Sequence, residues 1–155
     1  MARIESQLVS GILRNANLLL KVGNRLCGKF GITQQQWVVL EALAREPKGL
    51  KLSDLGKDLL VTKSNITGLV DRLERDDYVL REVTADDRRV LIARITEKGQ
   101  KALEKIRRRV HEWYPRSFSS FSREEKETML GYNQRLFEFL YQDLYRGEPN
   151  DETDL

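Results

Sequence analysis

The chain has 155 residues, of which 40% are hydrophobic, 33% are charged and 8% are aromatic. This is enough for one domain or two small lobes with a hydrophobic core, and it excludes a fully disordered chain or a collagen-like repeat. No apolar run is longer than four residues, so no segment is expected to cross a membrane. Polar residues interrupt the segment 11–22, which rules it out as the apolar core of a signal peptide. We therefore expect a cytoplasmic protein.

Cysteine and histidine usage argues against a metal site. Cys27 and His111 are the only residues of their types, so they permit no internal disulfide and no zinc site of the usual kind. A glycine-rich phosphate loop is also missing, and the carboxylates are scattered along helix faces. We expect no cofactor, no metal ligands and no catalytic residues, and an enzyme is the weakest hypothesis.

The net charge is +3, from 27 basic and 24 acidic residues. The last nine residues hold four acids and no base, so the rest of the chain carries +7. That sign favours an anionic partner, but a mixed-charge solvated surface is the common case. Residues 51–100 contain ten bases and ten acids. A nucleic-acid hypothesis must therefore depend on where the bases lie.

The first half of the chain has helical periodicity. Apolar residues from Ile4 to Leu26 form one stripe of a long helix that ends at Gly28 and Gly31. Thr33 can cap a second helix, which ends before Pro47. Two short helical patterns follow at 52–59 and 62–75, separated by two residues.

The second half begins with a change to extended spacing. Segments 79–83 and 90–95 flank a polar turn, 84–89, which predicts a β-hairpin with a charged tip. Thr96 can cap a further helix that runs up to Pro115. Ser122 and Glu125 have the spacing of a capping box and open a last helix that continues through Leu144. The predicted fold is mainly α with a small β-hairpin.

The paired short helices predict a helix-turn-helix. In the second helix the apolar side consists of Ile66, Leu69, Val70 and Leu73, and Gly68 would allow close approach to a neighbouring backbone. The polar side chains left for the other face and the leading end can reach base edges and phosphates. They are Thr62, Lys63, Ser64, Asn65, Thr67 and Arg72. The alternative is a merely amphipathic helix in which Thr62 is an N-cap and the charges are solvated.

The hairpin favours the DNA-binding interpretation. A charged strand-turn-strand directly after a helix-turn-helix is a wing, and Arg88 and Arg89 at its tip can enter a minor groove. Asp87 either holds an arginine in position or is an ordinary turn residue.

These residues carry a resemblance to a known family. The segments 52–56, 61–65 and 70–76, followed by Asp87-Arg88-Arg89 and by Ile95-Thr96-Glu97-Lys98-Gly99, resemble the MarR family of bacterial and archaeal regulators. The similarity covers residues 4–145. Ile95 replaces the usual leucine of the family, and Asp77 stands where the family often has glycine before the first wing strand.

The resemblance implies a homodimeric winged helix-turn-helix protein that binds double-stranded DNA at a pseudo-palindromic operator. Residues 1–30 and 100–146 would form the dimerisation lobe, residues 31–99 the DNA-binding lobe, and 147–155 an acidic disordered tail. The six polar residues of 62–72 would contact the major groove, and Arg89, supported by Asp87, the minor groove. Ser53 and Lys57 can touch phosphates. The helices at the two ends of the chain also carry more apolar surface than a small winged domain can cover, which independently suggests a dimer.

The resemblance also suggests a repressor released by a small aromatic or phenolic anion. Candidate lining residues are Arg14, Trp37 and His111, although core packing is the preferred role for Trp37. Two alternatives remain open. One is a winged-helix protein-interaction module without specific DNA binding, motivated by the zero charge of residues 51–100. The other is a redox-responsive regulator based on Cys27, for which a buried structural thiol is the preferred explanation.

Overall fold

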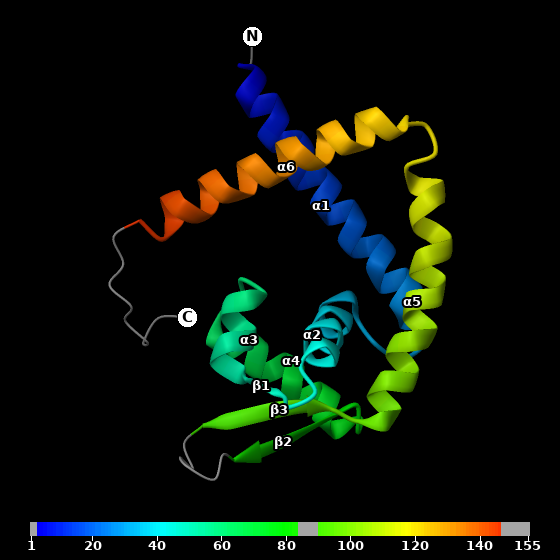
Figure 1. Ribbon diagram of the computed structural model, residues 1–155, viewed down its shortest axis with the longest axis vertical. Coiled ribbons are helices and arrows are strands. Elements are labelled where there is room, and N and C mark those ends of the chain that lie inside the picture. The colour runs from blue at the N-terminus through cyan, green and yellow to red at the C-terminus, as the bar shows by residue number, and fades with distance from the viewer. Residues whose placement is uncertain (1–2, 84–89, 147–155) are drawn as a thin grey trace. The chain divides into compact units, whose positions relative to one another are not determined.

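The computed structural model describes residues 3–83 and 90–146 (Figure 1). The chain forms two compact units, one ending at Arg109 and the other beginning at Val110. The helices are α1 (Ile4–Gly28), α2 (Gln34–Arg45), α3 (Leu52–Asp58), α4 (Lys63–Arg75), α5 (Glu97–Ser117) and α6 (Arg123–Leu144). The strands are β1 (Leu50–Lys51), β2 (Val79–Val83) and β3 (Leu91–Ile95). The predicted mainly α fold with a small hairpin is confirmed, as is the order of its helices.

Helix ends follow the local chemistry that the sequence indicated. Thr33 opens α2 and Ser122 opens α6, each with a reciprocal capping box formed with the residue three positions later. Pro115 departs from the prediction because it lies inside α5, which continues to Ser117. A proline in the last turn removes only the hydrogen bond to the carbonyl of residue 111, which lies on an exposed stretch of helix, so the helix tolerates it.

The sheet has one strand more than the sequence predicted. Its order is β1-β3-β2, with antiparallel pairs that set Leu50 and Arg81 on opposite sides of Ala93. A two-residue strand is too short to show alternation, so β1 was missed. Gly49 makes the approach possible: its φ is 84°, and a Cβ there would lie 2.5 Å from Ile92 Cγ2.

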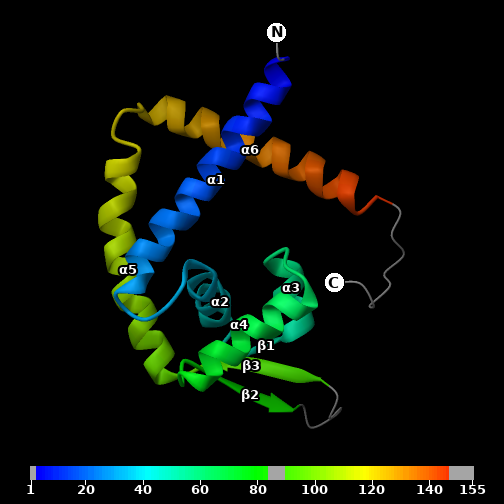
Figure 2. The same ribbon diagram turned by 180° about the vertical axis from the view of Figure 1, so that it is seen from behind.

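The core of the first unit fixes which face of α4 points outward. Leu40, Leu43, Leu55, Ile66 and Leu73 are all fully buried. Helices α3 and α4 pack against each other, α2 packs on α4, and β2 follows α4 closely (Figure 2). Because Ile66, Leu73 and their helical neighbours anchor α4, its remaining positions face away from this core.

The second unit has little core of its own. Helix α6 buries no residue, although Phe137 and Tyr141 stack with ring centroids 5.8 Å apart. The first half of α1, in the other unit, also exposes its apolar side chains. Along residues 3–83 and 90–146, no helix combines the length and apolar character needed to span a membrane.

Candidate nucleic-acid interface

The turn between α3 and α4 is tight and hydrogen-bonded. Val61 N donates to Gly56 O over 3.0 Å, and Leu60 takes a left-handed conformation with φ of 53°. A Cβ at Gly56 would lie 3.3 Å from Val61 O, so the two helices approach closely. The predicted helix-turn-helix is present with this geometry, and α4 begins directly after it.

Two of the six candidate contacts on α4 use their hydroxyls inside the helix. Thr62 is the N-cap, since its Oγ1 accepts from Asn65 N at 3.3 Å. Thr67 Oγ1 donates to Lys63 O over 2.8 Å. For Thr62 the plain capping role, weighed as an alternative, is therefore confirmed. Thr67 is half-buried, so its hydroxyl is less available than its type suggested.

The other four candidates are exposed. In the described parts of the chain, no hydrogen bond or ion pair engages the side chains of Lys63, Ser64, Asn65 or Arg72. The first three occupy the leading turn of α4, where helix N–H groups also point outward. This end of α4 therefore presents an amine, a hydroxyl and an amide to solvent on a rigid support. On α3, Ser53 and Lys57 are exposed as well, and Ser53 Oγ donates to Asp54 over 3.4 Å.

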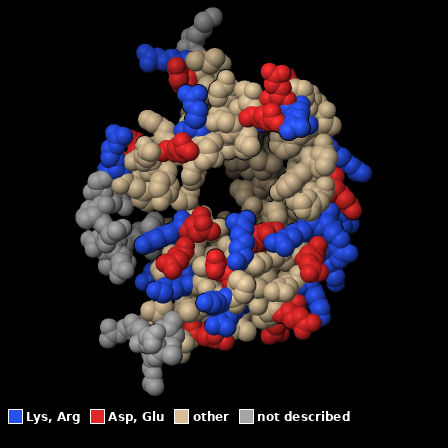
Figure 3. All heavy atoms as spheres, viewed as in Figure 1, with Lys and Arg blue, Asp and Glu red and all other residues tan. Residues whose placement is uncertain are grey.

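The zero net charge of residues 51–100 conceals an ordered arrangement. Within the described residues, most acids of this region have a basic partner within 4 Å, and the pairs include Asp71 and Glu74 with Arg81, Asp76 with Arg75, Asp77 with Lys98, Glu82 with Arg94, and Glu97 with Lys101. The bases without such a partner there are Lys51, Lys57, Lys63 and Arg72. On the face that Figure 3 shows, blue and red atoms are accordingly mixed. The described acids of this region without a basic partner are Asp54 and Asp58 on α3, so unpaired charge of both signs lies there, whereas the unpaired charges on α4 are the bases Lys63 and Arg72.

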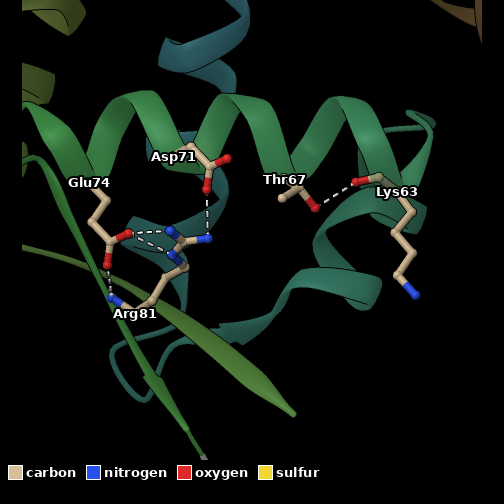
Figure 4. Close-up of polar contacts among 5 residues, drawn as sticks. All are labelled: Lys63, Thr67, Asp71, Glu74 and Arg81. Carbon is tan, nitrogen blue, oxygen red and sulfur yellow. Dashed lines mark hydrogen bonds and ion pairs between the residues drawn. The ribbon is translucent and has the colours of Figure 1, made fainter. Parts of the chain in front are cut away.

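Arg81 on β2 is a participant that the sequence did not reveal. Its Nε donates to Glu74 Oε2 over 2.7 Å, its Nη2 bonds the same oxygen, and its Nη1 pairs with Asp71 Oδ1 at 2.7 Å (Figure 4). The hydrogen bonds from Arg81 hold the pKa of Glu74 below its usual value. No local spacing marks this cluster, because it depends on β2 folding back along α4.

The strands of the wing are present, but its tip, with Asp87, Arg88 and Arg89, lies outside the described residues. The base of the wing is joined firmly to α5. Thr96 N donates to Tyr78 O over 3.0 Å, and Thr96 Oγ1 donates to Asp77 O over 2.7 Å. Thr96 Oγ1 also accepts a hydrogen bond from Gly99 N at 3.0 Å. A Cβ on Gly99 would lie only 2.2 Å from Tyr78 O. The Thr96 to Gly99 segment is thus a structural joint between the base of the wing and α5.

Two glycine-related expectations have clear outcomes. Asp77, at the position where the family often has glycine, has a φ of 58°, so the left-handed turn is kept by an aspartate. Gly68 was expected to approach a neighbouring backbone, and this is wrong within the described chain, because a Cβ there would meet nothing within 4 Å. The outer face of α4 is open at that point.

The candidate effector residues are divided between the two units. Arg14 is exposed on α1, and His111 is exposed in the second unit. Trp37 is half-buried and its Nε1 donates to Glu41 Oε1 over 3.1 Å. Arg107 also binds Glu41, at 2.9 and 2.6 Å, and its hydrogen bonds lower the pKa of that carboxyl. Trp37 is thus part of a polar link between α2 and α5, which the sequence did not indicate.

The thiol of Cys27 is fully buried, and burial raises its pKa to about 11. A protonated, enclosed thiol is a poor nucleophile and a poor sensor of oxidants. This favours the structural role over the redox alternative. Among the described residues, no group of three or more potential ligands from His, Cys, Asp and Glu is placed to hold a metal ion.

Comparison with known proteins identifies the family. Residues 30–90 match the sequence profile of the MarR family. Over 132 residues the chain is 32% identical to the transcriptional activatory protein BadR of Rhodopseudomonas palustris. The matched residues span 83% of this chain and 75% of BadR. The chain belongs to the MarR family. The homoprotocatechuate degradative operon repressor of Escherichia coli is another relative, 28% identical over 101 residues that span 65% of this chain and 68% of the repressor.

Solved structures of MarR-family and related regulators share the fold. The S. aureus MepR–DNA complex superposes with a TM-score of 0.79 at 26% identity, covering 85% of this chain and 97% of that one. BldR from Sulfolobus solfataricus gives a TM-score of 0.76 at 27% identity, covering 89% and 99%. The resemblance drawn from the helix-turn-helix and wing motifs is confirmed, and the winged-helix architecture with it.

Proposed function

We propose that this MarR-family regulator binds double-stranded DNA sequence-specifically and reads base edges with the leading turn of α4. The observation that carries the proposal is the row of exposed side chains at Lys63, Ser64 and Asn65, which have no hydrogen-bond or ion-pair partner in the part of the chain that the structure describes and lie on a helix whose other face is buried. S. aureus MepR, whose structure shares this fold, has been solved as a complex with DNA, which supports DNA binding by this chain.

Each group on this turn suits a defined contact. Asn65 can bond an adenine edge at two atoms, Lys63 can donate to guanine, and Ser64 can bond either kind of base. Lys57 and Ser53 on α3 are proposed phosphate contacts. The exposed Thr62 and Arg72 and the half-buried Thr67 are proposed major-groove contacts at the edges of the surface. Arg88 and Arg89 of the wing, with Asp87 supporting Arg89, are the proposed minor-groove contacts.

The functional protein is proposed to be a homodimer whose half-sites lie about 10 base pairs apart. Exposed apolar surface supports this in each of the two units considered separately. The first half of α1 exposes Ile4, Leu8, Val9, Ile12 and Leu13. The second unit exposes Phe118, Phe121, Phe137, Phe139, Tyr141 and Leu144. Surfaces of this extent on a water-soluble regulator are usually covered by a second chain.

A repressor released by a small aromatic anion is the proposed mode of regulation. Relatives are named for both directions of control, a repressor of a homoprotocatechuate degradative operon and a transcriptional activatory protein. Arg14, Trp37 and His111 remain the proposed effector contacts. Release of bound DNA by aromatic carboxylates, screened as a panel, would test the effector proposal independently of DNA recognition.

A protein-interaction module without specific DNA binding is the second candidate function, based on the zero charge of residues 51–100. Within the described part of this region the bases without an ion-pair partner, Lys51, Lys57, Lys63 and Arg72, outnumber the acids without one, Asp54 and Asp58. This excess of unpaired bases favours an anionic partner such as DNA.

Asn65→Ala tests the proposal, with Gln100→Ala as the matched control, because Gln100 is an exposed helical amide on α5. We expect Asn65→Ala to weaken binding to the preferred duplex by about 1–3 kcal/mol and to relax preference at particular bases. Gln100→Ala is expected to bind as the unchanged protein does. Equal effects of both changes, or none, would count against recognition by this turn of α4.

A further inference from the structure

Arg81 pairs with two acids of the proposed recognition helix α4, Asp71 and Glu74. These acids lie on a face of α4 that also carries proposed DNA contacts. Lys63, Thr67 and Asp71 follow one another at four-residue spacing on α4, and Glu74 continues the row (Figure 4). Side chains at these spacings share one face of a helix. Asp71 has about half of its side chain exposed, at 51%. The row that begins with a proposed DNA contact therefore ends with two carboxylates.

Carboxylates at this point are unfavourable in two ways. They lie in the second half of α4, where the helix dipole disfavours negative charge. They also lie within one Debye length of a phosphate backbone docked on α4, so their repulsion is only partly screened. Something must offset them if this face of α4 is to bind DNA.

Arg81 does this with all of its side-chain nitrogens. Nε and Nη2 engage Glu74, Nη1 engages Asp71, and the backbone N of Arg81 donates to Glu74 Oε1 over 3.3 Å. The arginine is mostly covered, with 24% of its side chain exposed. Each side-chain nitrogen of Arg81 is thus directed at one of the two acids.

The pairing persists across the physiological pH range. The pKa of Glu74 is lowered and that of Arg81 is raised by their mutual hydrogen bonds, so neither group titrates near neutrality. The same contacts connect the middle of β2 to α4, because Arg81 lies opposite Ala93 in the hairpin. The cluster therefore holds both a fixed charge balance and a fixed distance between wing strand and recognition helix.

We infer that Arg81 is a positioning residue for DNA binding, which offsets part of the negative charge of Asp71 and Glu74 from behind the recognition surface and does not itself contact DNA. This inference rests on the proposed function. Arg81 thus raises the affinity for DNA through its ion pairs with Asp71 and Glu74, without a contact of its own to DNA.

The test compares four variants on the duplex that the unchanged protein selects. Arg81→Gln is expected to weaken binding about tenfold, because it leaves two carboxylates uncompensated beside the phosphates. Adding Asp71→Asn and Glu74→Gln to Arg81→Gln is expected to restore most of that loss, and Arg81→Lys to give an intermediate value, since one amine cannot engage both acids as a guanidinium does. Arg94→Gln on β3 is the control, because within residues 3–83 and 90–146 Arg94 pairs with one acid, Glu82, at 3.4 Å.

The double variant Asp71→Asn with Glu74→Gln keeps Arg81 and gives a second, independent readout should Arg81→Gln fail to fold. It is expected to bind a few-fold more tightly at low salt than the unchanged protein. The inference is overturned by a triple variant that stays weak and loses about one unit of salt dependence, since that pattern marks a direct phosphate contact. It is equally overturned by Arg81→Gln binding as tightly as the unchanged protein. An unchanged protein that selects no duplex would overturn the proposed function first, and this inference with it.

Discussion

Replacing Gly99 by alanine tests the joint between the base of the wing and α5. The new Cβ would lie 2.2 Å from Tyr78 O and 2.8 Å from Ile95 Cγ1. Neither neighbour can move freely, because Tyr78 O accepts the 3.0 Å bond from Thr96 N. Overpacking of this kind costs about 1–3 kcal/mol, and the helix propensity of alanine returns less than about 1 kcal/mol. We therefore expect a net loss of about 1–2 kcal/mol in the free energy of unfolding.

Gly131→Ala is the matched control for that measurement. Gly131 lies inside α6 and a Cβ there would meet nothing within 4 Å, so alanine should stabilise the protein by about 0.5–1 kcal/mol. Both variants can be compared with the unchanged protein by urea unfolding followed by circular dichroism, at one fixed protein concentration. If Gly99→Ala proved as stable as the unchanged protein, the close approach at this joint would not exist.

Three further outcomes follow from single side chains. Asp77→Gly should retain the stability of the unchanged protein to within about 1 kcal/mol, whereas Asp77→Val should lose about 1–2 kcal/mol, because a β-branched residue does not accept a φ of 58°; urea unfolding distinguishes them. Glu41→Gln should destabilise by about 1 kcal/mol at neutral pH through its partly exposed link to Arg107, and the difference should vanish as the pH falls through the lowered pKa of Glu41, since the carboxylate contributes only while ionised. Cys27 should react with a disulfide reagent at pH 8 only in denaturant, and stability should decline as the pH rises from about 9 toward the folded pKa of about 11; fast reaction of the native thiol would contradict its burial.

Local signals in the sequence predicted most of the fold because they are read from neighbouring residues. The caps at Thr33 and Ser122, the glycine at the end of α1 and the alternation of the wing strands all act over a few positions. The strand β1 has two residues and depends on β3, more than forty positions away, so no local pattern could reveal it. The end of α5 was predicted at Pro115, but the helix continues to Ser117.

The candidate site was predicted by residue type, and the structure refined it by hydrogen bonding. Lys63, Ser64 and Asn65 are exposed as a contact surface requires, while the hydroxyls of Thr62 and Thr67 serve the helix itself. Polar residues that cap or bond back to their own helix look the same in sequence as those that project to a partner.

Ion pairs between different helices and strands could not be predicted from the sequence, for a different reason. Arg81 meets Asp71 and Glu74 only when β2 lies along α4, and Arg107 meets Glu41 across 66 positions. Summing the charge of residues 51–100 therefore concealed which bases are paired. The balance of charge at a surface depends on the fold, whereas net charge depends on composition alone.

Sequence-specific DNA binding by α4 is tested most directly by selection of duplexes from a random-sequence pool, followed by fluorescence anisotropy of the selected and scrambled duplexes at several salt concentrations. We expect a pseudo-palindromic motif with half-sites about 10 base pairs apart, and binding to it at least about 10³-fold tighter than to scrambled DNA. Equal, salt-sensitive affinity for both duplexes, or no enrichment of any motif, would contradict sequence-specific recognition by α4.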